Sequence, residues 1–382
     1  MINNRIQIGY VSEYNPFKDK KAWSGSIYKL REAIENAGFN VVWIPYKTNT
    51  LCIRIYLFVL RLLFRGNDIC YRHNKWYYKL VSRTIDTHHS DFLHSKYLFF
   101  PGGAQISQYL KPSKATIYYS DASFHSMLNY YWYNVRPWIL KQCDMCEKEA
   151  IHHSAINLRA SQWAANSLIN HYGENYHKVF VLPLGPTLET KDLIPVRPYQ
   201  SGVLRVLFSG VEWERKGGSI AVETVAKLIQ NGIDARLVIV GIHTLPEQYQ
   251  NIEYIEHIGF LNKNNPTEYK QYVETIRQCH ILLLPTKAEC AGIVFSEASA
   301  FGLPIFTYDT GGIGSYVKNE VNGYRLPTKC DAADFSNSIC KALKSGKIKE
   351  MHHKAITFYQ KELAWNNWSN NFKDIINEFE HK

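Results

Sequence analysis

The stretch Ile281-Leu-Leu-Leu-Pro-Thr-Lys-Ala-Glu-Cys-Ala-Gly-Ile-Val-Phe-Ser-Glu297 decides the fold of this chain of 382 residues. Its apolar start predicts a strand that is buried on both faces. Pro285 ends the strand because proline has no amide hydrogen to donate to a sheet. After Gly292, residues 293–301 read as a helix, and residues 304–308 read as the next strand. The stretch therefore predicts one βαβ motif.

The start of that helix predicts a phosphate site. The amides of Gly292, Ile293 and Val294 are first-turn donors, and the helix dipole is positive there. Gly292 also allows a ligand to approach the backbone closely. Glu289 precedes the helix and Glu297 lies inside it. Two carboxylates around a phosphate site favour a ligand with phosphates and hydroxyls, and a nucleotide sugar fits.

Glu289 through Glu297 resembles the Glu-x7-Glu signature of the retaining GT-B glycosyltransferases, family four, also called glycosyl transferases group 1. The flanking segments 300–304, 309–312 and 321–324 resemble that family too. The resemblance implies an α/β fold of two doubly wound, Rossmann-like domains facing a cleft. The alternative is an ordinary βαβ crossover with two solvated glutamates.

A second site segment follows a strand over residues 204–209. The turn 210–218 resembles the phosphate-binding loop of the family, and Lys216 matches its lysine. The usual arginine is replaced by Val211, and Arg215 is a candidate substitute. Two cations beside a glycine pair at the start of a helix suit a diphosphate. The alternative is a solvated, charged turn.

The N-terminal part reads as another doubly wound domain, with a strand over residues 6–12, a helix over 27–37 and a strand over 40–45. The turn between the first strand and the helix is not Gly-x-Gly-x-x-Gly, so a dinucleotide oxidoreductase is not supported. In the resembled family this turn faces the cleft, and Gly25 would let donor phosphate or acceptor approach. The alternative is a helix cap formed by Ser24.

Asp121 and His125 are further candidates for the catalytic site, where they would contact a donor-sugar hydroxyl. They follow a predicted strand over residues 116–120, and ligands of doubly wound sheets bind beyond such strand ends. Relatives carry a histidine near the position of Asp121, so this sequence departs from the family there. The alternative for Asp121 is the N-cap of the next helix.

The charge is uneven along the chain. Residues 1–187 hold 22 Lys and Arg against 12 Asp and Glu, which gives +10, whereas residues 188–382 hold 22 of each. This asymmetry predicts an acidic partner: a pyrophosphate-linked lipid or an anionic membrane face that the N-terminal half contacts peripherally. No nucleic-acid-binding module is recognisable, so nucleic acid is not an expected partner.

The segment 51–64 is strongly apolar, but it is too short and too charged to span a bilayer, because Arg54, Arg61 and Arg65 interrupt or follow it. One interpretation is a core-facing helix with a solvated stripe of arginines. The other is a helix that lies on a membrane surface.

The chain length favours two domains. The expected limits are 1–187 for the acceptor-side domain, 188–202 for a linker and 203–360 for the nucleotide-sugar domain. The last helix, 361–382, is expected to return to the first domain, as in the resembled family.

The resemblance implies a metal-independent, retaining hexosyltransferase without a cofactor, which takes a nucleoside-diphosphate sugar as donor and a glycan or lipid-linked glycan as acceptor. Bacterial surface polysaccharide synthesis, of lipopolysaccharide or capsule, is the expected process. Scattered cysteines and the absence of a signal peptide favour the cytoplasm, at the inner face of the cell membrane. The alternatives are an inactive scaffold in a membrane glycan-assembly complex, a sugar-nucleotide epimerase and an inverting transferase.

Overall fold

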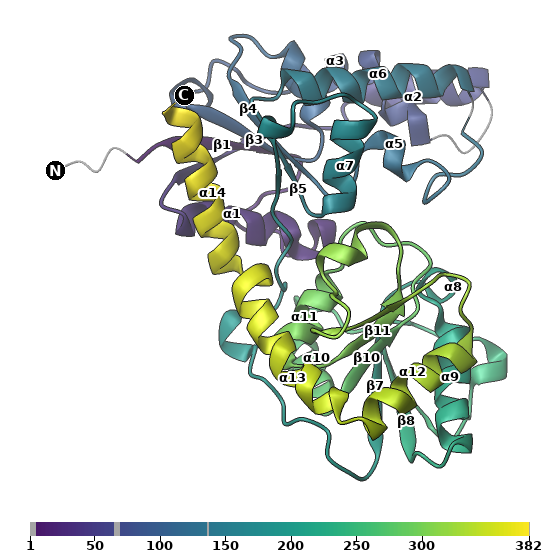
Figure 1. Ribbon diagram of the computed structural model, residues 1–382. Helices are drawn as coiled ribbons and strands as arrows, with labels where there is room; N and C mark the ends of the chain where they lie inside the picture. Colours follow the sequence, from purple (N-terminus) through teal and green to yellow (C-terminus); the bar gives the residue numbers. More distant parts are fainter. Residues whose placement is uncertain (1–4, 65–68, 136, 382) are drawn as a thin grey trace. The chain divides into compact units, whose positions relative to one another are not determined.

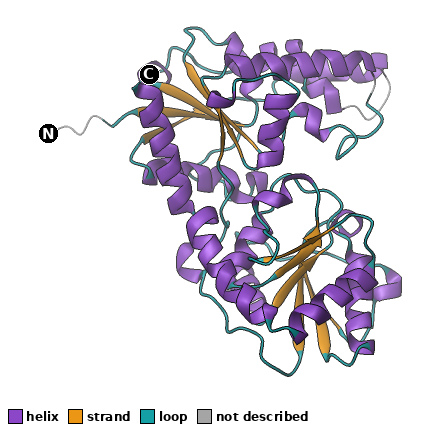
Figure 2. Cartoon of the chain, in the orientation of Figure 1, coloured by secondary structure: helices purple, strands orange, loops and turns teal. Residues whose placement is uncertain are grey.

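The computed structural model describes residues 5–64, 69–135 and 137–381 (Figure 1). The chain divides into two compact units. Residues 1–182 and 369–382 form the N-terminal unit, and residues 183–368 form the C-terminal unit. Within each unit, helices cover both faces of a parallel sheet (Figure 2). Two parallel sheets sandwiched in this way are the α/β architecture that the sequence predicts.

The N-terminal sheet has six parallel strands in the order β2-β1-β3-β4-β5-β6. Their bounds are β1 Gln7–Ser12, β2 Asn40–Pro45, β3 Tyr97–Pro101, β4 Ala115–Ser120, β5 Ile156–Arg159 and β6 Val179–Val181. The helices around them are α1 Ser26–Asn36, α2 Leu51–Phe64, α3 Lys75–Ser82, α4 Ser90–His94, α5 Phe124–Met127, α6 Pro137–His153 and α7 Gln162–Asn170. The predicted strand–helix–strand start of this unit is confirmed.

The C-terminal sheet also has six parallel strands, in the order β12-β11-β10-β7-β8-β9. Their bounds are β7 Leu204–Ser209, β8 Ala235–Val240, β9 Ile255–Gly259, β10 Ile281–Leu284, β11 Ile305–Tyr308 and β12 Gly323–Leu326. The helices are α8 Trp213–Lys216, α9 Gly218–Gln230, α10 Pro266–Arg277, α11 Ile293–Phe301, α12 Ala332–Lys344 and α13 Lys347–Phe358.

The predicted βαβ motif is present as β10, α11 and β11. All four residues of β10 are buried, as expected for a strand covered on both faces. Gly302 follows α11 with φ 77°, a left-handed conformation that suits glycine. The turn predicted over residues 210–218 differs in one respect, because it contains the one-turn helix α8.

The boundary between the units differs from the predicted one. It lies between Leu182 and Pro183, and the stretch 188–202, expected as a linker, belongs to the C-terminal unit. Leu188 is buried in the core of that unit, and the Val196 amide donates to the Phe301 carbonyl at 3.0 Å. Pro195 and Pro198 favour an extended backbone in this stretch, and the extended segment packs against the C-terminal unit.

The predicted Ser24 cap of α1 is wrong. The N-cap is Gly25, which has φ 89° and makes no side-chain cap. Trp23 and Ser24, with φ 50° and 54°, precede it in the left-handed region. Three successive left-handed residues explain why glycine stands at the last of them, since only glycine adopts this conformation without steric cost.

The last helix, α14 Trp365–Glu380, passes from one unit to the other. In the N-terminal unit the Ser369 hydroxyl donates to the Ala33 carbonyl at 2.8 Å, and Phe372 packs edge-on against Phe39. In the C-terminal unit the Trp365 indole donates to the Pro186 carbonyl at 2.7 Å. These contacts give the aromatic residues of this helix a packing role.

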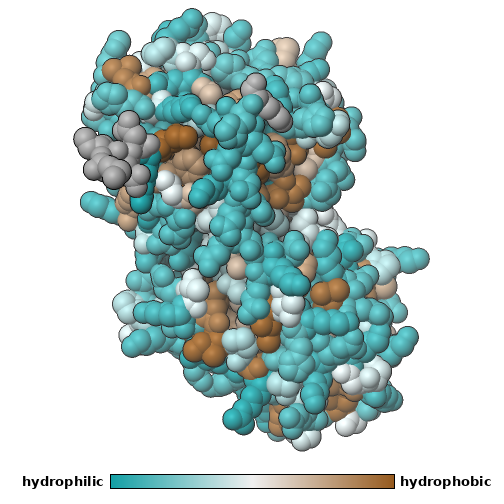
Figure 3. Space-filling model, turned by 60° about the vertical axis from the view of Figure 1, so that its left-hand side comes forward, coloured by the Kyte–Doolittle hydropathy of each residue, from teal (hydrophilic) through white to brown (hydrophobic). Residues whose placement is uncertain are grey.

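The surface seen in Figure 3 is mostly hydrophilic, with hydrophobic residues in separate patches. Among the described residues, no helix combines the length and the apolar character that a membrane span requires.

Candidate functional site

The strand order of the C-terminal sheet positions the predicted donor site. From β7 the chain proceeds to β8 and β9 on one side, whereas β10, β11 and β12 lie on the other side. The order therefore reverses between β7 and β10. Loops at the carboxyl ends of two such strands part and leave room for a ligand. The two loops here are residues 210–217 after β7 and residues 285–292 after β10, which are the two segments that the sequence singled out.

Lys216 and Glu289 meet between these two loops. The Lys216 ammonium forms an ion pair and a hydrogen bond with the Glu289 carboxylate. Both side chains are largely enclosed, with 10% and 12% of their surface exposed. Gly217 lets the loops approach, since a Cβ atom there would lie 2.2 Å from the Pro285 carbonyl oxygen. The Lys287 amide also donates to the Arg215 carbonyl at 2.8 Å.

Arg215 is held by its own loop. Its guanidinium makes two hydrogen bonds of 2.9 Å to Glu212, and a third of 2.9 Å to the Ala288 carbonyl. It lies 3.8 Å from the Glu289 carboxylate. The bonds from Arg215 lower the pKa of Glu212. Arg215 thus stands beside the ion pair, but it must exchange Glu212 for any diphosphate that it binds.

Gly292 is required by packing. Its φ of −94° suits any residue, but a Cβ atom there would lie 2.0 Å from the ring of the buried Phe295. The Phe295 amide donates to the Gly292 carbonyl at 2.9 Å and starts α11. The amides of Gly292, Ile293 and Val294 are the first-turn donors of this nine-residue helix. They follow the Glu289 loop directly, as the sequence predicts.

Glu297 lies in the interior of the unit, with 1% of its surface exposed. Its Oε1 atom accepts hydrogen bonds from Lys263 at 2.8 Å and from Thr187 at 3.0 Å. Its Oε2 atom accepts one from the Tyr272 hydroxyl at 2.8 Å. Burial, together with the Glu297 charge, raises the pKa of Tyr272 and keeps it a neutral donor. A buried carboxylate needs partners of this kind.

These contacts exclude the two alternatives of the sequence analysis, an ordinary crossover with solvated glutamates and a solvated, charged turn. The two glutamates are enclosed and paired, so neither is a solvated glutamate of an ordinary crossover. The turn that contains Lys216 is not a solvated charged turn either, because Lys216 itself is buried.

Two aromatic rings lie beyond the next strands of the same sheet edge. His243 follows β8 and Phe260 follows β9, and their rings stack with centroids 4.6 Å apart and an interplanar angle of 20°. Phe260 is 44% exposed. An exposed, stacked ring offers a flat apolar face to a second aromatic system.

The N-terminal unit has a cavity of about 400 Å³ at the corresponding edge of its own sheet, which is within the usual range for small-molecule sites. The cavity opens where β1, β3 and β4 end. The strand order of the N-terminal sheet reverses between β1 and β3, so the cavity lies where that order reverses. Aromatic side chains form much of its wall: Tyr46, Tyr77, Tyr78, Phe124 and Trp132.

Buried polar groups form part of the lining of this cavity. Glu147 accepts hydrogen bonds from the Tyr118 hydroxyl, at 3.1 Å, and from the Gln105 amide. Burial raises the pKa of Glu147, although the nearby charge of Arg159 opposes this shift. The buried Arg159 guanidinium lies 4.2 Å from the centre of the Tyr118 ring. Gln105 keeps its carbonyl oxygen without a hydrogen-bond partner and thus has an acceptor to offer.

Asp121 lines the same cavity, but it is not the cap of the next helix. Ser123 caps α5 and forms a capping box with Ser126, so the capping alternative for Asp121 is wrong. Asp121 instead accepts a hydrogen bond of 3.3 Å from the Trp23 indole. This contact connects Asp121 to the left-handed turn that ends at Gly25.

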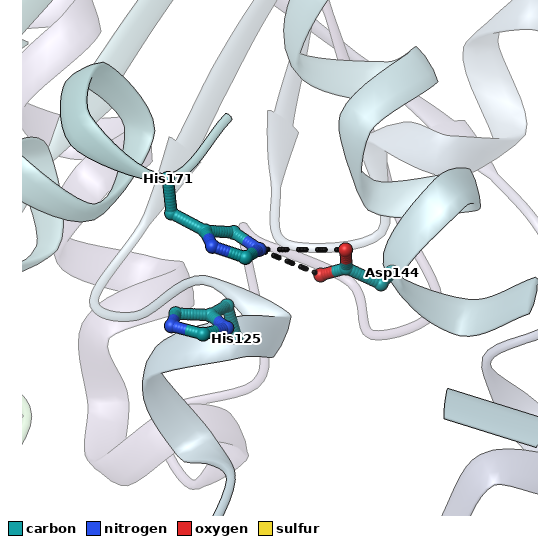
Figure 4. A group of neighbouring side chains, drawn as sticks. All are labelled: His125, Asp144 and His171. Carbon is teal, nitrogen blue, oxygen red and sulfur yellow. Dashed lines mark hydrogen bonds and ion pairs between the residues drawn. The ribbon is translucent and has the colours of Figure 1, made fainter. Parts of the chain in front are cut away.

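His125 is not among the residues that line this cavity. Its ring stacks on that of His171 with centroids 3.4 Å apart, and the His171 Nε2 atom is 3.4 Å from both oxygens of Asp144 (Figure 4). Burial and His171 lower the pKa of His125. The rings are nearly parallel, at 12°, so their in-plane lone pairs do not converge on one point about 2.1 Å away, as zinc would require.

Sequence reasoning missed several of these groups. Lys263, Tyr272 and Thr187 hold Glu297, and Gln105 and Glu147 border the N-terminal cavity. None belongs to a motif or has a characteristic spacing. Only the polar run 262–265 before Pro266, which starts α10, marks a loop in the sequence around Lys263.

Comparison with known proteins agrees with this geometry. Residues 195–361 match the sequence model described as "Glycosyl transferases group 1". A D-inositol 3-phosphate glycosyltransferase of Xylanimonas cellulosilytica is 24% identical over 194 residues, which span 46% of this chain and 46% of that relative. The match thus covers less than half of the relative's length.

Solved structures resemble nearly the whole chain. Sucrose-phosphate synthase of Thermosynechococcus elongatus superposes with a TM-score of 0.68 at 15% identity, over 99% of this chain and 100% of that one. HepE of Anabaena, solved with UDP and glucose, gives 0.59 at 13% identity, over 98% and 100%. The chain therefore has the two-domain GT-B fold, and residues 195–361 of its C-terminal unit are similar to the glycosyl transferases group 1 family.

Proposed function

We propose that this protein transfers a sugar from a nucleoside-diphosphate sugar to a hydroxyl of a glycan or lipid-linked glycan, with retention. The observation that carries this proposal is the enclosed Lys216–Glu289 ion pair, which lies where the strand order reverses. An ammonium has three donors, and only one is needed for Glu289, so Lys216 can also bind a diphosphate. The amides at the start of α11 provide further donors for the same anion.

The donor would lie along the carboxyl edge of the C-terminal sheet. The diphosphate binds Lys216 and the first turn of α11, and the base stacks on Phe260. Glu289 then faces the transferred sugar, and the buried Glu297 acts on the nucleoside side by holding Lys263 in place. Lys216 and the helix start stabilise the departing diphosphate, which is the task that a metal ion performs in other transferases. HepE, solved with UDP and glucose, supports a donor of this class.

The acceptor would bind in the N-terminal cavity. Aromatic walls suit the apolar faces of a sugar ring, and Gln105, Glu147 and Asp121 suit its hydroxyls. The pathway, assembly of a bacterial lipopolysaccharide or capsule at the cytoplasmic face of the cell membrane, rests on the motif resemblance and on the basic N-terminal half.

The test uses the purified full chain with UDP, GDP, ADP and dTDP and their sugar conjugates. One nucleotide series should raise the melting temperature, because ligand at a hundred times its Kd adds about 2.7 kcal/mol to stability. With acceptor glycans, the matching conjugate should then release nucleoside diphosphate, and NMR should find the anomeric configuration retained. Binding without turnover would favour the inactive scaffold, a changed sugar without acceptor would favour an epimerase, and an inverted product would contradict retention.

A further inference from the structure

α2 turns an apolar stripe away from the protein. Leu51, Ile55, Phe58 and Leu62 have 70%, 54%, 65% and 68% of their surface exposed. Their spacings are four, three and four residues. Since each residue turns by roughly 100° around a helix axis, these spacings bring all four side chains onto one line along the helix. We call this line the α2 stripe.

The opposite face fixes how α2 is oriented. Ile53 is fully buried in a core cluster of the N-terminal unit, and Leu57 and Leu60 pack against a second cluster there, which includes residues of α5 and α6. The Tyr56 hydroxyl donates to Asn74 at 2.7 Å. The helix is therefore anchored on one side, and this packing leaves the stripe outside.

Cations lie along one flank of the stripe. Arg54 and Arg61 are both exposed and are seven residues apart, so they project from the same side of the helix. The sequence of α2 contains no Asp or Glu. Residues 1–187 carry a net charge of +10. The third arginine of the sequence pattern, Arg65, lies outside the described residues. The solvated face is therefore apolar with an arginine edge, not the stripe of arginines expected for a core-facing helix.

We infer that α2 docks the N-terminal unit onto an anionic lipid bilayer. The α2 stripe would enter the boundary between headgroups and acyl chains, as amphipathic surface helices do. Arg54 and Arg61 would reach the lipid phosphates from the flank, because their long apolar stems can lie along the bilayer surface. This inference concerns lipid binding alone and holds whether or not the proposed transfer reaction is correct.

A second copy of the chain is a poorer occupant of this face. α2 has 14 residues. A helix of that length is roughly 21 Å long, and its exposed apolar face consists of the stripe and the neighbouring Val59 and Leu63. A stable interface buries about 800 Å² on each partner, more than such a face offers. Two exposed arginines on the same flank would also face like charges in many dimer arrangements, whereas they complement an anionic surface.

The test measures co-sedimentation of the full chain with vesicles of phosphatidylcholine alone or mixed with phosphatidylglycerol. We expect binding to the anionic vesicles that weakens with added salt. The triple variant Ile55→Gln, Phe58→Gln, Leu62→Gln should lose at least tenfold in apparent affinity. Its control, Leu93→Gln, Tyr176→Gln, Ile229→Gln, removes three other exposed apolar side chains and should bind as the parent does.

A charge variant separates the contribution of the arginines to lipid binding from that of the apolar stripe. Arg54→Gln with Arg61→Gln should weaken binding to anionic vesicles about thirtyfold, from about 1 kcal/mol per cation near the surface. The double variant Lys341→Gln, Lys344→Gln in α12 removes the same charge from the C-terminal unit and should change binding little.

Three results would overturn the inference: no binding of the parent to anionic vesicles, equal binding of the parent and the triple variant, or equal losses in the triple variant and its control. A parent that forms dimers, which the triple variant abolishes without any lipid binding, would assign the stripe to self-association. Nucleotide-induced thermal shifts on the same variants show whether the donor site is intact. A variant that loses lipid binding but keeps a normal nucleotide-induced thermal shift has lost only the contribution of α2. A parent protein without a nucleotide-induced thermal shift would contradict the proposed function and leave the lipid-binding inference unaffected.

Discussion

Lys216 and Glu289 are 73 residues apart in the sequence and form an enclosed ion pair between the loops that follow β7 and β10. The pair explains why both motifs are needed in one site. In the proposed site the cation would bind the diphosphate, and the ion pair orients the carboxylate beside it. Removal of either partner leaves the other charge poorly compensated in an enclosed place.

We expect Lys216→Ala to lose nucleoside-diphosphate affinity. A charged hydrogen-bond donor contributes about 1.5–3 kcal/mol, which corresponds to a loss of roughly ten- to a hundredfold. Isothermal calorimetry with the diphosphate identified by the thermal-shift panel measures this loss. Lys227→Ala, which removes a lysine from the last turn of α9, is the matched control. Unchanged affinity in Lys216→Ala would show that the loop assignment is wrong.

Substitutions of Glu289 and Glu297 should have different effects on diphosphate affinity and on turnover. Glu297→Gln should weaken both the nucleotide sugar and the bare diphosphate, because it removes the charge that holds Lys263. Glu289→Gln should bind the bare diphosphate nearly as the parent does but turn over slowly, because contacts to the sugar that tighten as charge develops act on the transition state. Calorimetry with the diphosphate and steady-state transfer kinetics distinguish the two. Equal losses of diphosphate affinity would contradict this division.

Transfer should survive chelation. Lys216 and the helix start provide the positive charge that the leaving diphosphate needs. We therefore expect the same rate with and without excess EDTA, measured after dialysis of the enzyme. Abolition by EDTA that only added Mg²⁺ or Mn²⁺ reverses would refute a metal-independent mechanism.

The left-handed turn before α1 should yield a stabilising substitution. Ser24 has φ 54°, a backbone conformation that costs an L-residue roughly 1–2 kcal/mol and that glycine adopts freely. Glycine also has more conformational freedom in the unfolded chain, and this entropy offsets part of the gain in stability. Ser24→Gly should raise the free energy of unfolding of the N-terminal unit by about 0.5–1 kcal/mol. Ser26→Gly, at the first residue of α1 with φ −64°, is the control and should not raise the free energy of unfolding, because no left-handed strain is relieved there. Urea unfolding followed by circular dichroism measures both changes, and a Ser24→Gly protein less stable than the parent would show that the turn is not strained.

His73 should make the N-terminal unit less stable in acid. Its ring is enclosed by Tyr78, Phe124 and Trp132. Burial and the nearby Arg72 charge lower its pKa to about 4. The unfolded chain then binds more protons than the folded one between about pH 4 and 6.5, so stability falls as the pH falls through that window. The contribution is about 2 kcal/mol between pH 7 and pH 5.

The measurement for His73 compares parent and His73→Gln by urea unfolding at pH 7 and pH 5. The variant should lose less stability on acidification than the parent, whatever its stability at pH 7. Glu147, whose pKa burial raises, acts in the opposite direction in both proteins and therefore cancels in the comparison. Parallel pH profiles would show that His73 is not protonated on unfolding.

Local sequence patterns predicted the βαβ motif accurately. Residues 281–284, 293–301 and 305–308 form β10, α11 and β11, because proline and glycine mark the ends of these elements through backbone geometry alone. The short helices α3 and α4 were not predicted, since eight and five residues are too few for a clear period.

The sequence by itself determined which segments carry the proposed donor site, since Glu289, Glu297 and Lys216 follow short, local motifs. Only the tertiary structure decided their partners: Lys216 with Glu289, and Glu297 with Lys263 and Tyr272. The reason is that ion pairs and buried hydrogen bonds depend on how distant strands are ordered in the sheet, which no local spacing encodes. The exposure of the α2 stripe was decided in the same way. In the sequence of this mostly apolar helix the two arginines mark only one exposed flank, and the packing of Ile53 in the core decided which apolar residues face outward.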